Sequence, residues 1–543
     1  MSFSSKLSPF GASLVAIIVA APILGMVWTA LQPGDPEIWE HLASTVLPRY
    51  IFGSFAIAFG TIGLSACIGI PCAWLVTRTR FPGSIFFQWA LLLPMAVPAY
   101  VLAYCWTDLL EYAGPIQSGL RDLFGWSRGD YFFPNIRSLP GAILVMSLVL
   151  YPYVFLCARA AFLEQGASAF EAARSLGWGP KRCFFQLAIP LARPGIIAGC
   201  ALVGMEALAD YGTVDYFGVQ TFTTGITRTW HGFGSYVSAV RLALLLLTAV
   251  LFVLMLERIS RGSRRFTRSG GKQQPPRPTQ LKGTASIAAC FLCSFPLGLG
   301  FGLPVTLLTK YCFTHASTSA WWDLRTEAWT SLRLGGLTAG LAVVIGVLLA
   351  YGIRLYASKG TTIATRIASL GYAVPGSVVA VAVVVPLAWI DNSWLDPAFG
   401  SGLLLSGSGF ALVYAYVVRF LAVALSGAET GLSSIPQHLD QAARGLGASP
   451  IRTLFQVHAP LAKASVLTGG LLVFVDVLKE LPASLLLRPA SGATLAVRVH
   501  QFVSQETLHL AALPALAIVL TGLLPVLLLT KGIGSPRTVQ PST

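Results

Sequence analysis

Two pairs of carboxylates lie where the sequence is otherwise strongly apolar. Glu206 and Asp210 form one pair, and Asp476 and Glu480 form the other. Each pair has the spacing i, i+4, which places both side chains on one face of a helix. Ionisable groups within apolar helices are costly and usually face a pore or a partner. Because carboxylates attract cations, these four residues are candidates for the lining or gate of a cation pathway.

A second interpretation of the four acids is structural. Lys479 lies beside Glu480, and Arg228 is another cation that can reach them, so the acids can belong to a network of ion pairs and backbone hydrogen bonds. Four close carboxylates without such partners would repel one another, which raises the pKa of some of them. An unpaired set therefore makes most sense if a cation sometimes neutralises it.

Both acidic pairs follow the two copies of a long internal repeat. Residues 168–195 return as residues 438–465, and the second acidic pair follows the first at the same offset of 270 positions. Further matches at an offset of 277 extend the repeat, so that the second to fifth apolar segments correspond to the eighth to eleventh. The matching runs are Ala172-Ala173-Arg174 with Ala442-Ala443-Arg444, Pro190-Leu191-Ala192 with Pro460-Leu461-Ala462, and Ala96-Val97-Pro98 with Ala373-Val374-Pro375.

Each copy of the repeated loop predicts two short helices around a tight turn. Gly177 and Gly447 are natural helix stops, because glycine readily adopts the left-handed conformation found after a helix. Pro180 and Pro450 are natural first residues of the helix that follows. Two equivalent polar loops between apolar segments argue for a shared function rather than for ordinary connectors.

The composition is that of an integral membrane protein. The chain has 543 residues, of which 55% are hydrophobic and 11% charged, and its mean hydropathy is +0.70. Soluble domains carry about 25% charged residues. Many apolar runs of roughly 20 residues can each cross a bilayer. These runs are continuous rather than alternating, which predicts helices and not the strands of a barrel.

We expect an all-α protein with twelve transmembrane helices in two parallel six-helix repeats. The first half comprises residues 1–256 and the second residues 285–543, joined by a basic linker at 257–284. Because six is an even number, both halves insert in the same sense. The expected spans lie near 11–31, 52–76, 86–107, 139–161, 195–215, 236–256, 285–307, 332–353, 365–390, 407–427, 465–486 and 509–530.

The net charge of +15 reflects membrane orientation and not a nucleic-acid partner. The basic residues lie in loops between spans, as lysine and arginine do on the cytoplasmic side of membrane proteins. Arg78, Arg354 and both repeated loops then face the cytoplasm, and so do both chain termini. The linker carries eight Lys or Arg and one acid between residues 257 and 283, which is typical of a flexible connector near anionic lipid headgroups.

The repeated loop resembles the cytoplasmic signature of ABC-importer permeases that work with a substrate-binding protein. In that family the loop is the coupling helix that docks into an ATPase subunit, and the fold is the type I importer permease fold. Gln441 replaces the acid of the second copy, so any salt bridge there can belong only to the first half. The resemblance implies these coupling residues: Glu171, Ala172, Ala173, Gly177 and Pro190, then Gln441, Ala442, Ala443, Gly447 and Pro460.

Three longer stretches, residues 91–126, 205–230 and 476–502, look like the fused, double-length permeases of ferric-iron importers. This resemblance covers nearly the whole chain and implies two ATP-binding subunits, a periplasmic iron-binding protein and a place in the bacterial inner membrane. The loop signature alone identifies only the superfamily, so thiamine, polyamine and phosphonate remain alternative substrates. Tyr100, Tyr104, Asp108 and Tyr112 are candidates for the outer route, although interfacial aromatics are an equally good interpretation.

The chain has no motif for catalysis. It lacks the run GxxxxGK[ST] that binds nucleotide phosphates; Gly270-Gly271-Lys272 is the nearest stretch. Cys290 and Cys293 form a CxxC within an apolar span without a nearby His or acid, which favours small core residues over a metal site. We therefore expect neither enzyme activity nor a cofactor. A proton-coupled secondary transporter of twelve helices is the rival interpretation, and the paired loops argue against it.

Overall fold

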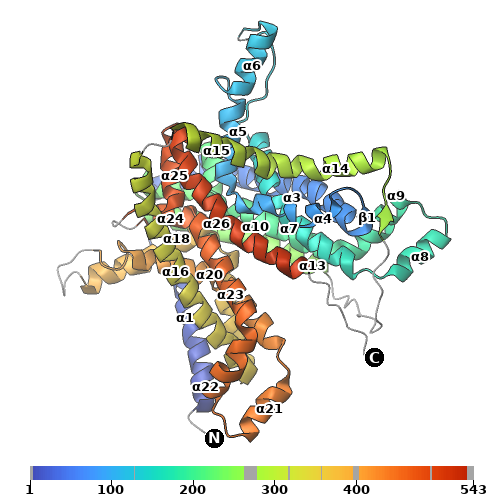
Figure 1. Cartoon of the computed structure of the whole chain (residues 1–543). Helices are drawn as coiled ribbons and strands as arrows, with labels where there is room; N and C mark the ends of the chain where they lie inside the picture. The colour runs from blue at the N-terminus through green and yellow to red at the C-terminus, as the bar shows by residue number, and fades with distance from the viewer. Residues whose placement is uncertain are drawn as a thin grey trace.

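The computed structural model describes residues 4–127, 129–261, 278–315, 318–355, 358–395, 403–488 and 492–534, which are almost wholly helical (Figure 1). The helices of the first half are α1 (Ser4–Ala30), α2 (Pro36–His41), α3 (Leu47–Arg78), α4 (Ser84–Ala90), α5 (Ala99–Leu110), α6 (Pro115–Phe124), α7 (Leu139–Glu164), α8 (Ala167–Ser175), α9 (Pro180–Arg182), α10 (Ile189–Ala209), α11 (Gly212–Tyr216), α12 (Phe222–His231) and α13 (Tyr236–Arg261). Those of the second half are α14 (Thr284–Leu297), α15 (Leu303–His315), α16 (Thr318–Leu355), α17 (Lys359–Ala368), α18 (Gly376–Ile390), α20 (Gly409–Ser433), α21 (Gln437–Gly445), α22 (Pro450–Thr453), α23 (Ala459–Lys479), α24 (Pro482–Leu486), α25 (Leu495–Ser504) and α26 (Leu508–Gly534).

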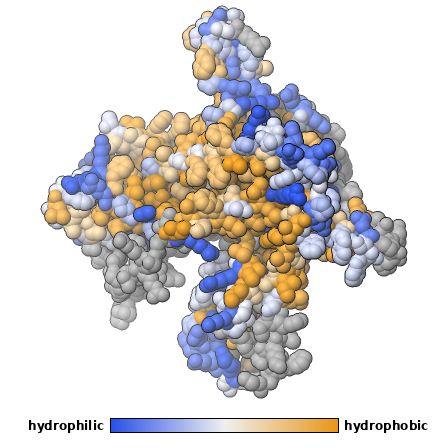
Figure 2. All heavy atoms as spheres, turned by 180° about the vertical axis from the view of Figure 1, so that it is seen from behind, coloured by the Kyte–Doolittle hydropathy of each residue, from blue (hydrophilic) through white to orange (hydrophobic). Residues whose placement is uncertain are grey.

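The predicted number of membrane spans is confirmed. Among the described residues, 11 helical segments are long and apolar enough to cross a membrane. The pair Ser84–Ala96 and Ala99–Phe124, bent by 89° at its break, passes the same test together and brings the number to 12 when it is counted as one broken span. An apolar belt covers the middle of the molecule, and hydrophilic residues gather at its ends (Figure 2). Apolar side chains on this belt face lipid rather than water.

Four of the predicted spans are interrupted, in matching places in the two halves. The predicted third and ninth spans each pass through a short 3-10 turn, Leu93–Ala96 and Ser369–Ala373, and restart after Pro98 and Pro375. Proline has no backbone N–H to continue the helix, which explains these two breaks. The predicted fifth and eleventh spans, 195–215 and 465–486, end earlier, at Ala209 and Lys479, and short helices follow them.

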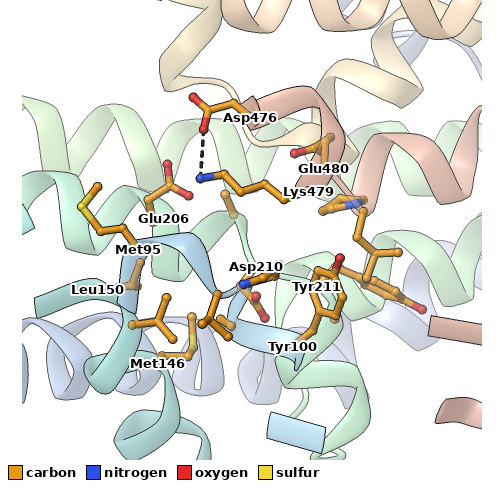
Figure 3. Close-up of a pocket in the computed structure, with 18 of the residues that line it drawn as sticks. Met95, Tyr100, Met146, Leu150, Glu206, Asp210, Tyr211, Asp476, Lys479 and Glu480 are labelled. Carbon is orange, nitrogen blue, oxygen red and sulfur yellow. Dashed lines mark ion pairs between the residues drawn. The ribbon is translucent and has the colours of Figure 1, made fainter. Parts of the chain in front are cut away.

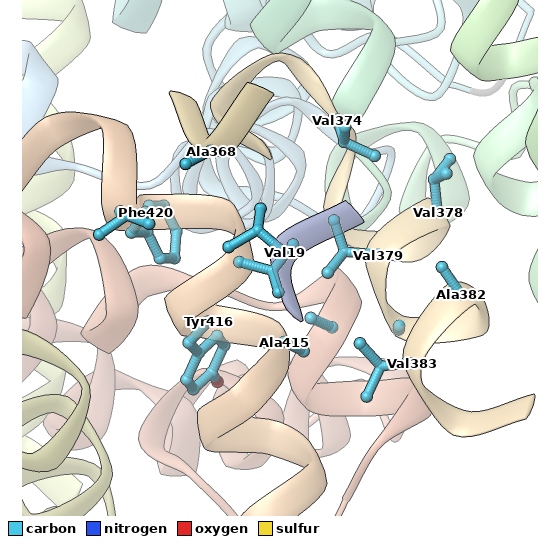
Figure 4. Close-up of a cluster of buried hydrophobic side chains, with 14 of the residues drawn as sticks. Val19, Ala368, Val374, Val378, Val379, Ala382, Val383, Ala415, Tyr416 and Phe420 are labelled. Carbon is cyan, nitrogen blue, oxygen red and sulfur yellow. The ribbon is translucent and has the colours of Figure 1, made fainter. Parts of the chain in front are cut away.

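The first span of each half packs against helices of the other half. Helix α1 packs against α17 and α18 of the second half, and α14 packs against α3 and α4 of the first. Val19 of α1 lies in one apolar cluster with Val378 and Val383 of α18 and with Ala415 of α20 (Figure 4). The exchange ties the halves together, so the boundary between them in sequence is not their boundary in space.

The two helical bundles diverge like the arms of a V (Figure 1). In one arm α3, α7 and α10 pack together, and in the other α16, α20 and α23 do so. The repeated loops, α8–α9 and α21–α22, lie at the far ends of the two arms, while α6 projects from the opposite side. We call the end that carries the repeated loops the loop end.

Part of the predicted linker is structured. Helix α13 continues to Arg261, five residues beyond the expected end of the first half, and residues 262–277 lie outside the described residues. Thr79–Arg80 (β1) and Thr279–Gln280 (β2) then pair as a short parallel ladder. The end of the linker is thereby attached to the loop that follows α3.

Candidate functional site: an acidic cavity between the repeats

A cavity of about 130 Å³ lies between the two halves, and all four candidate acids line it (Figure 3). Glu206 and Asp210 reach it from the end of α10, and Asp476 and Glu480 reach it from the end of α23. The internal repeat thus brings two acidic pairs together that are 270 positions apart in the sequence.

The second acid of each pair, Asp210 or Glu480, caps a short helix. Asp210 accepts hydrogen bonds from the backbone N–H groups of Thr213 (3.0 Å) and Val214 (3.2 Å), at the start of α11. Glu480 accepts one from the backbone N–H of Ala483 (3.2 Å), at the start of α24. A carboxylate there satisfies N–H groups that the helix leaves unpaired and interacts favourably with the helix dipole. These caps are the physical reason why the predicted fifth and eleventh spans are broken.

Glu480 has a second partner, Arg419 of α20. The two side chains form a buried ion pair of 2.8 Å. Gly376, at the start of α18, makes room for it, since a Cβ there would lie 2.0 Å from Nη1 of Arg419 and 2.1 Å from Oε1 of Glu480. Sequence analysis missed Arg419, although an arginine in the middle of the predicted span 407–427 is an ionisable residue of the kind that marks a pathway.

The first acids of the two pairs, Glu206 and Asp476, face the cavity and have fewer partners than Asp210 and Glu480. Asp476 forms an ion pair of 3.0 Å with Lys479, one turn further along α23. Glu206 lies on the same side of the cavity as this pair (Figure 3). No described residue donates a hydrogen bond to the Glu206 carboxylate. Lys479 thus pairs with Asp476 and not, as expected from the sequence, with the adjacent Glu480, and Arg228 is not among the residues that line the cavity.

The cavity carries an excess of negative charge. Its lining contains four carboxylates and two basic groups, Arg419 and Lys479, so the acids outnumber the bases by two. Among the described residues no three His, Cys, Asp or Glu side chains are close enough together to hold a metal ion. The arrangement therefore attracts cations without presenting a ready-made coordination shell.

A second and larger cavity, about 580 Å³, lies between the acidic cavity and the loop end. Tyr372 lines both cavities and stands between them. The wall of the larger cavity is made by α20 and α23 and consists mainly of small and hydroxyl-bearing side chains, among them Ser426, Gly427, Thr430, Ser465, Thr468 and Gly469. The two cavities therefore share one side chain, and the larger of them lies nearer the loop end.

The predicted outer-route residues separate into two groups. Tyr100 lines the acidic cavity, and Tyr104 packs beside it at 5.8 Å between ring centroids. Asp108 accepts a hydrogen bond of 2.6 Å from Tyr311. Tyr112 is 47% exposed and lies under the guanidinium of Arg121, away from the cavity.

The two repeated loops have nearly the same backbone conformation. Gly177 and Gly447 follow their helices with φ values of +77° and +73°, a region that favours glycine. Ala173 and Ala443 are buried, whereas Leu176 (75% exposed) and Leu446 (88% exposed) project outward. The remaining predicted coupling residues, Glu171, Ala172, Pro190, Gln441, Ala442 and Pro460, are exposed.

At the start of each repeated loop, an arginine donates hydrogen bonds to backbone carbonyls. Arg78 donates hydrogen bonds to the carbonyls of Phe162 (2.7 Å) and Gln165 (3.3 Å). Arg354 donates to the carbonyls of Leu432 and Ile435, which are the equivalent positions in the second half. The basic residues that sequence analysis assigned to membrane orientation therefore also fix the loops.

The two loops differ in what lies against that arginine. In the first half the ring of Phe170 lies 4.3 Å from the guanidinium carbon of Arg78. In the second half the equivalent residue is Asp440, which forms an ion pair of 2.6 Å with Arg354 and lies 2.7 Å from His458 Nε2. One loop is thus anchored by an aromatic ring and the other by charge.

The described part of the linker contacts the first of these loops. Arg174 of α8 donates a hydrogen bond of 3.1 Å to the hydroxyl of Thr279, in β2. No described residue of the linker forms a hydrogen bond with Arg444, its equivalent in the second half.

The pattern of the family described as the binding-protein-dependent transport system inner membrane component matches residues 65–264 and 342–533, one match in each half. The chain belongs to this family. It is therefore a multi-pass permease component, and the two matches explain why one polypeptide contains two equivalent loops and two equivalent acidic pairs.

Two relatives align with this permease over most of its length. The Fe(3+)-transport system permease protein FbpB 2 of Haemophilus influenzae is 26% identical over 96% of this chain and 98% of its own. The ferric transport system permease protein FbpB of Actinobacillus pleuropneumoniae is 24% identical over 87% of this chain and 69% of its own. A shorter match, with the molybdenum transport system permease protein ModB of Escherichia coli, is 32% identical over 36% of this chain and 77% of that protein.

Proposed function

We propose that this permease is the membrane subunit of an ATP-driven importer that moves ferric iron. The observation that carries the proposal is the meeting of Glu206 and Asp476, one from each repeat, in a cavity where acids outnumber bases. Ferric ion is a hard cation, and hard cations prefer carboxylate oxygen among protein ligands. The names of the two relatives that align over most of the chain point to the same cargo.

In this proposal two ATP-binding subunits dock on the loop end, one on α8–α9 and one on α21–α22. Each loop offers an exposed leucine, Leu176 or Leu446, flanked by an exposed arginine. An apolar side chain that projects from a polar loop suits a pocket on a partner. Because Glu171 is replaced by Gln441, the two contacts differ by one charge.

The loop end is then the cytoplasmic side of the inner membrane, and both chain termini lie there. The opposite side receives a periplasmic binding protein that delivers the ion. Helix α6 projects from that side (Figure 1) and carries Leu123, which is 76% exposed; Phe132, in the segment that follows α6, is 91% exposed. This surface is suited to contact with another protein.

In the proposed transport cycle the two arms pivot as rigid bodies. The larger cavity between α20 and α23, which shares Tyr372 with the acidic cavity, serves as the exit toward the cytoplasm. When ATP draws the ATPase subunits together, they bring α8 and α21 closer, and the arms separate on the periplasmic side. The ion then enters the acidic cavity, and its release inward follows when the arms return.

The test is uptake of labelled ferric iron into proteoliposomes that contain the permease, its ATPase subunits and its binding protein. We expect ATP-dependent uptake by the wild type and a large loss in Glu206→Gln. Glu164→Gln, which changes an exposed acid outside both cavities, is the matched control. Uptake of thiamine, a polyamine or a phosphonate in place of iron would overturn the cargo assignment. Uptake driven by a proton gradient without ATP would instead favour a secondary transporter.

A further inference from the structure

A ladder of phenol groups leads from the acidic cavity toward the periplasmic side. Tyr100 and Tyr211 line the cavity. Beyond Tyr100 lies Tyr104, and the ring of Tyr216 packs edge-on against Tyr104 at 4.6 Å. Tyr100 and Tyr104 are only 4% and 1% exposed, so the ladder closes the outer route in this conformation.

A histidine from the other half completes the ladder. His500 of α25 lies with its Nδ1 3.1 Å from the hydroxyl oxygen of Tyr104. Its ring also packs beside Tyr211, at 5.9 Å between centroids. Tyr104 and Tyr211 belong to the first half and His500 to the second, so these contacts join the two halves where the outer route must open.

The ladder contains polar groups that packing alone does not require. The Tyr100 hydroxyl is buried, and no described residue forms a hydrogen bond with it. Leaving a buried polar atom unpaired is costly, so such an atom needs an explanation. Four tyrosines and a histidine are an unusual choice for a seal that apolar residues would make more cheaply. A ligand that passes along the outer route would give these tyrosine and histidine groups a binding partner.

The chemistry of the ladder suits a ferric ion. Phenolate oxygen and imidazole nitrogen both bind iron, and tyrosine serves as an iron ligand in some haem proteins. The imidazole of His500 and the hydroxyl of Tyr104 already lie 3.1 Å apart, so both donor atoms can reach one ion. A tyrosine that binds the ion releases its proton to water, because metal binding displaces protons from its ligands.

We propose that Tyr104, Tyr211 and His500 form an entry subsite that takes the ferric ion from the binding protein and passes it to the acidic cavity. When the halves separate on the periplasmic side, Tyr104 parts from His500, and both groups become free to bind. When the halves close again, the ion moves inward toward Asp210 and Glu206. This inference rests on the proposed function, and it assigns a role in iron binding to residues other than the four acids of the cavity.

The experiment measures iron uptake and ATP hydrolysis together in the complete importer. The variants are Tyr104→Phe, which removes one hydroxyl, and His500→Gln. The control is Tyr414→Phe, whose hydroxyl donates to the carbonyl of Ile18 away from the cavity. We expect iron taken up per ATP hydrolysed to fall about tenfold or more in both variants. ATP hydrolysis stimulated by the loaded binding protein should stay within about twofold of wild type, because the coupling loops are unchanged.

A second measurement detects binding directly. The importer is held open to the periplasm with a non-hydrolysable ATP analogue and loaded with ferric iron. We expect a visible charge-transfer band from iron-bound phenolate in the wild type and a weaker band in Tyr104→Phe. This measurement reports ligation and does not depend on transport.

The outcomes separate the two proposals. If the wild type takes up no iron, the proposed function fails and the entry subsite fails with it. If the wild type takes up iron and both variants keep the same ratio of iron to ATP, the entry subsite is wrong and the proposed function stands. A loss of ATP hydrolysis together with uptake in both variants would mean that these residues only hold the halves together, which also overturns the subsite.

Discussion

Asp440 and Arg354 form an ion pair of 2.6 Å at the position where the other half of the molecule places Phe170 against Arg78. The backbone contacts of the two arginines are equivalent, yet one repeated loop depends on charge and the other on an aromatic ring. The two repeated loops of this permease are therefore alike in shape but different in what stabilises them.

Replacing Asp440 should loosen the second loop selectively. In Asp440→Asn, Arg354 stays largely buried without its counter-charge, and breaking a buried pair costs about 3 kcal/mol or more. We expect faster hydrogen exchange of the amides in α21, measured by mass spectrometry, with α8 unchanged. Gln441→Asn, at the neighbouring exposed position, is the control. Equal exchange in α21 of Asp440→Asn and wild type would refute this role.

The same loop should respond to acid. Burial alone raises the pKa of Asp440, but the hydrogen bond and charge of Arg354, together with His458, lower it below its usual value. Tyr351 and Arg444 also face Asp440 across a cavity of about 120 Å³.

A carboxyl whose pKa is lowered on folding stabilises the fold fully above its unfolded pKa, which is about 3.9 for aspartate. That contribution is lost as the pH falls below this value and through the folded pKa. Protection of α21 amides should therefore stay constant from neutral pH to about pH 5 and then decrease. In Asp440→Asn the corresponding decrease should be absent; a decrease of the same size would assign the effect to another group.

Gly447 should tolerate no bulky side chain. Its φ of +73° is strained for other residues, at a cost of about 1 kcal/mol for alanine and more for a β-branched residue. We expect Gly447→Val to insert normally but to lose ATP-dependent transport and co-purification with the ATPase subunits. Gly445→Ala, two positions earlier in α21, has open space around it and should behave as wild type. Normal transport by Gly447→Val would show that the turn is dispensable.

Gly376→Ala should disrupt the ion pair at the cavity. The added Cβ would occupy the space of both Arg419 and Glu480, and one of the two charges would have to move away from its partner. Loss of a buried pair costs about 3 to 5 kcal/mol, so we expect a clear drop in thermal stability of the purified permease. Gly336→Ala, where a Cβ meets nothing within 4 Å, is the control. Equal melting temperatures for the two variants would contradict the packing at Gly376.

Much of this architecture could be read from local patterns. Apolar runs of the right length predicted twelve spans, because a helix must satisfy its own backbone within a membrane. The offset repeat predicted two equivalent halves, and the spacing of Glu206 with Asp210 predicted a shared helix face. Span ends were less accurate where Asp210 and Glu480 cap short helices, since a capping carboxylate and a pore-lining one look the same in sequence.

The sequence by itself determined the number of spans, the twofold repetition and the acidic helix faces, because these depend on residues a few positions apart. Only the tertiary structure decided that α1 packs in the opposite half, that Arg419 pairs with Glu480, and that His500 meets Tyr104 across 396 positions. The physical reason is that lipid is as apolar as the helices it surrounds. Hydropathy therefore identifies a span, while side-chain packing and paired polar groups select its neighbours.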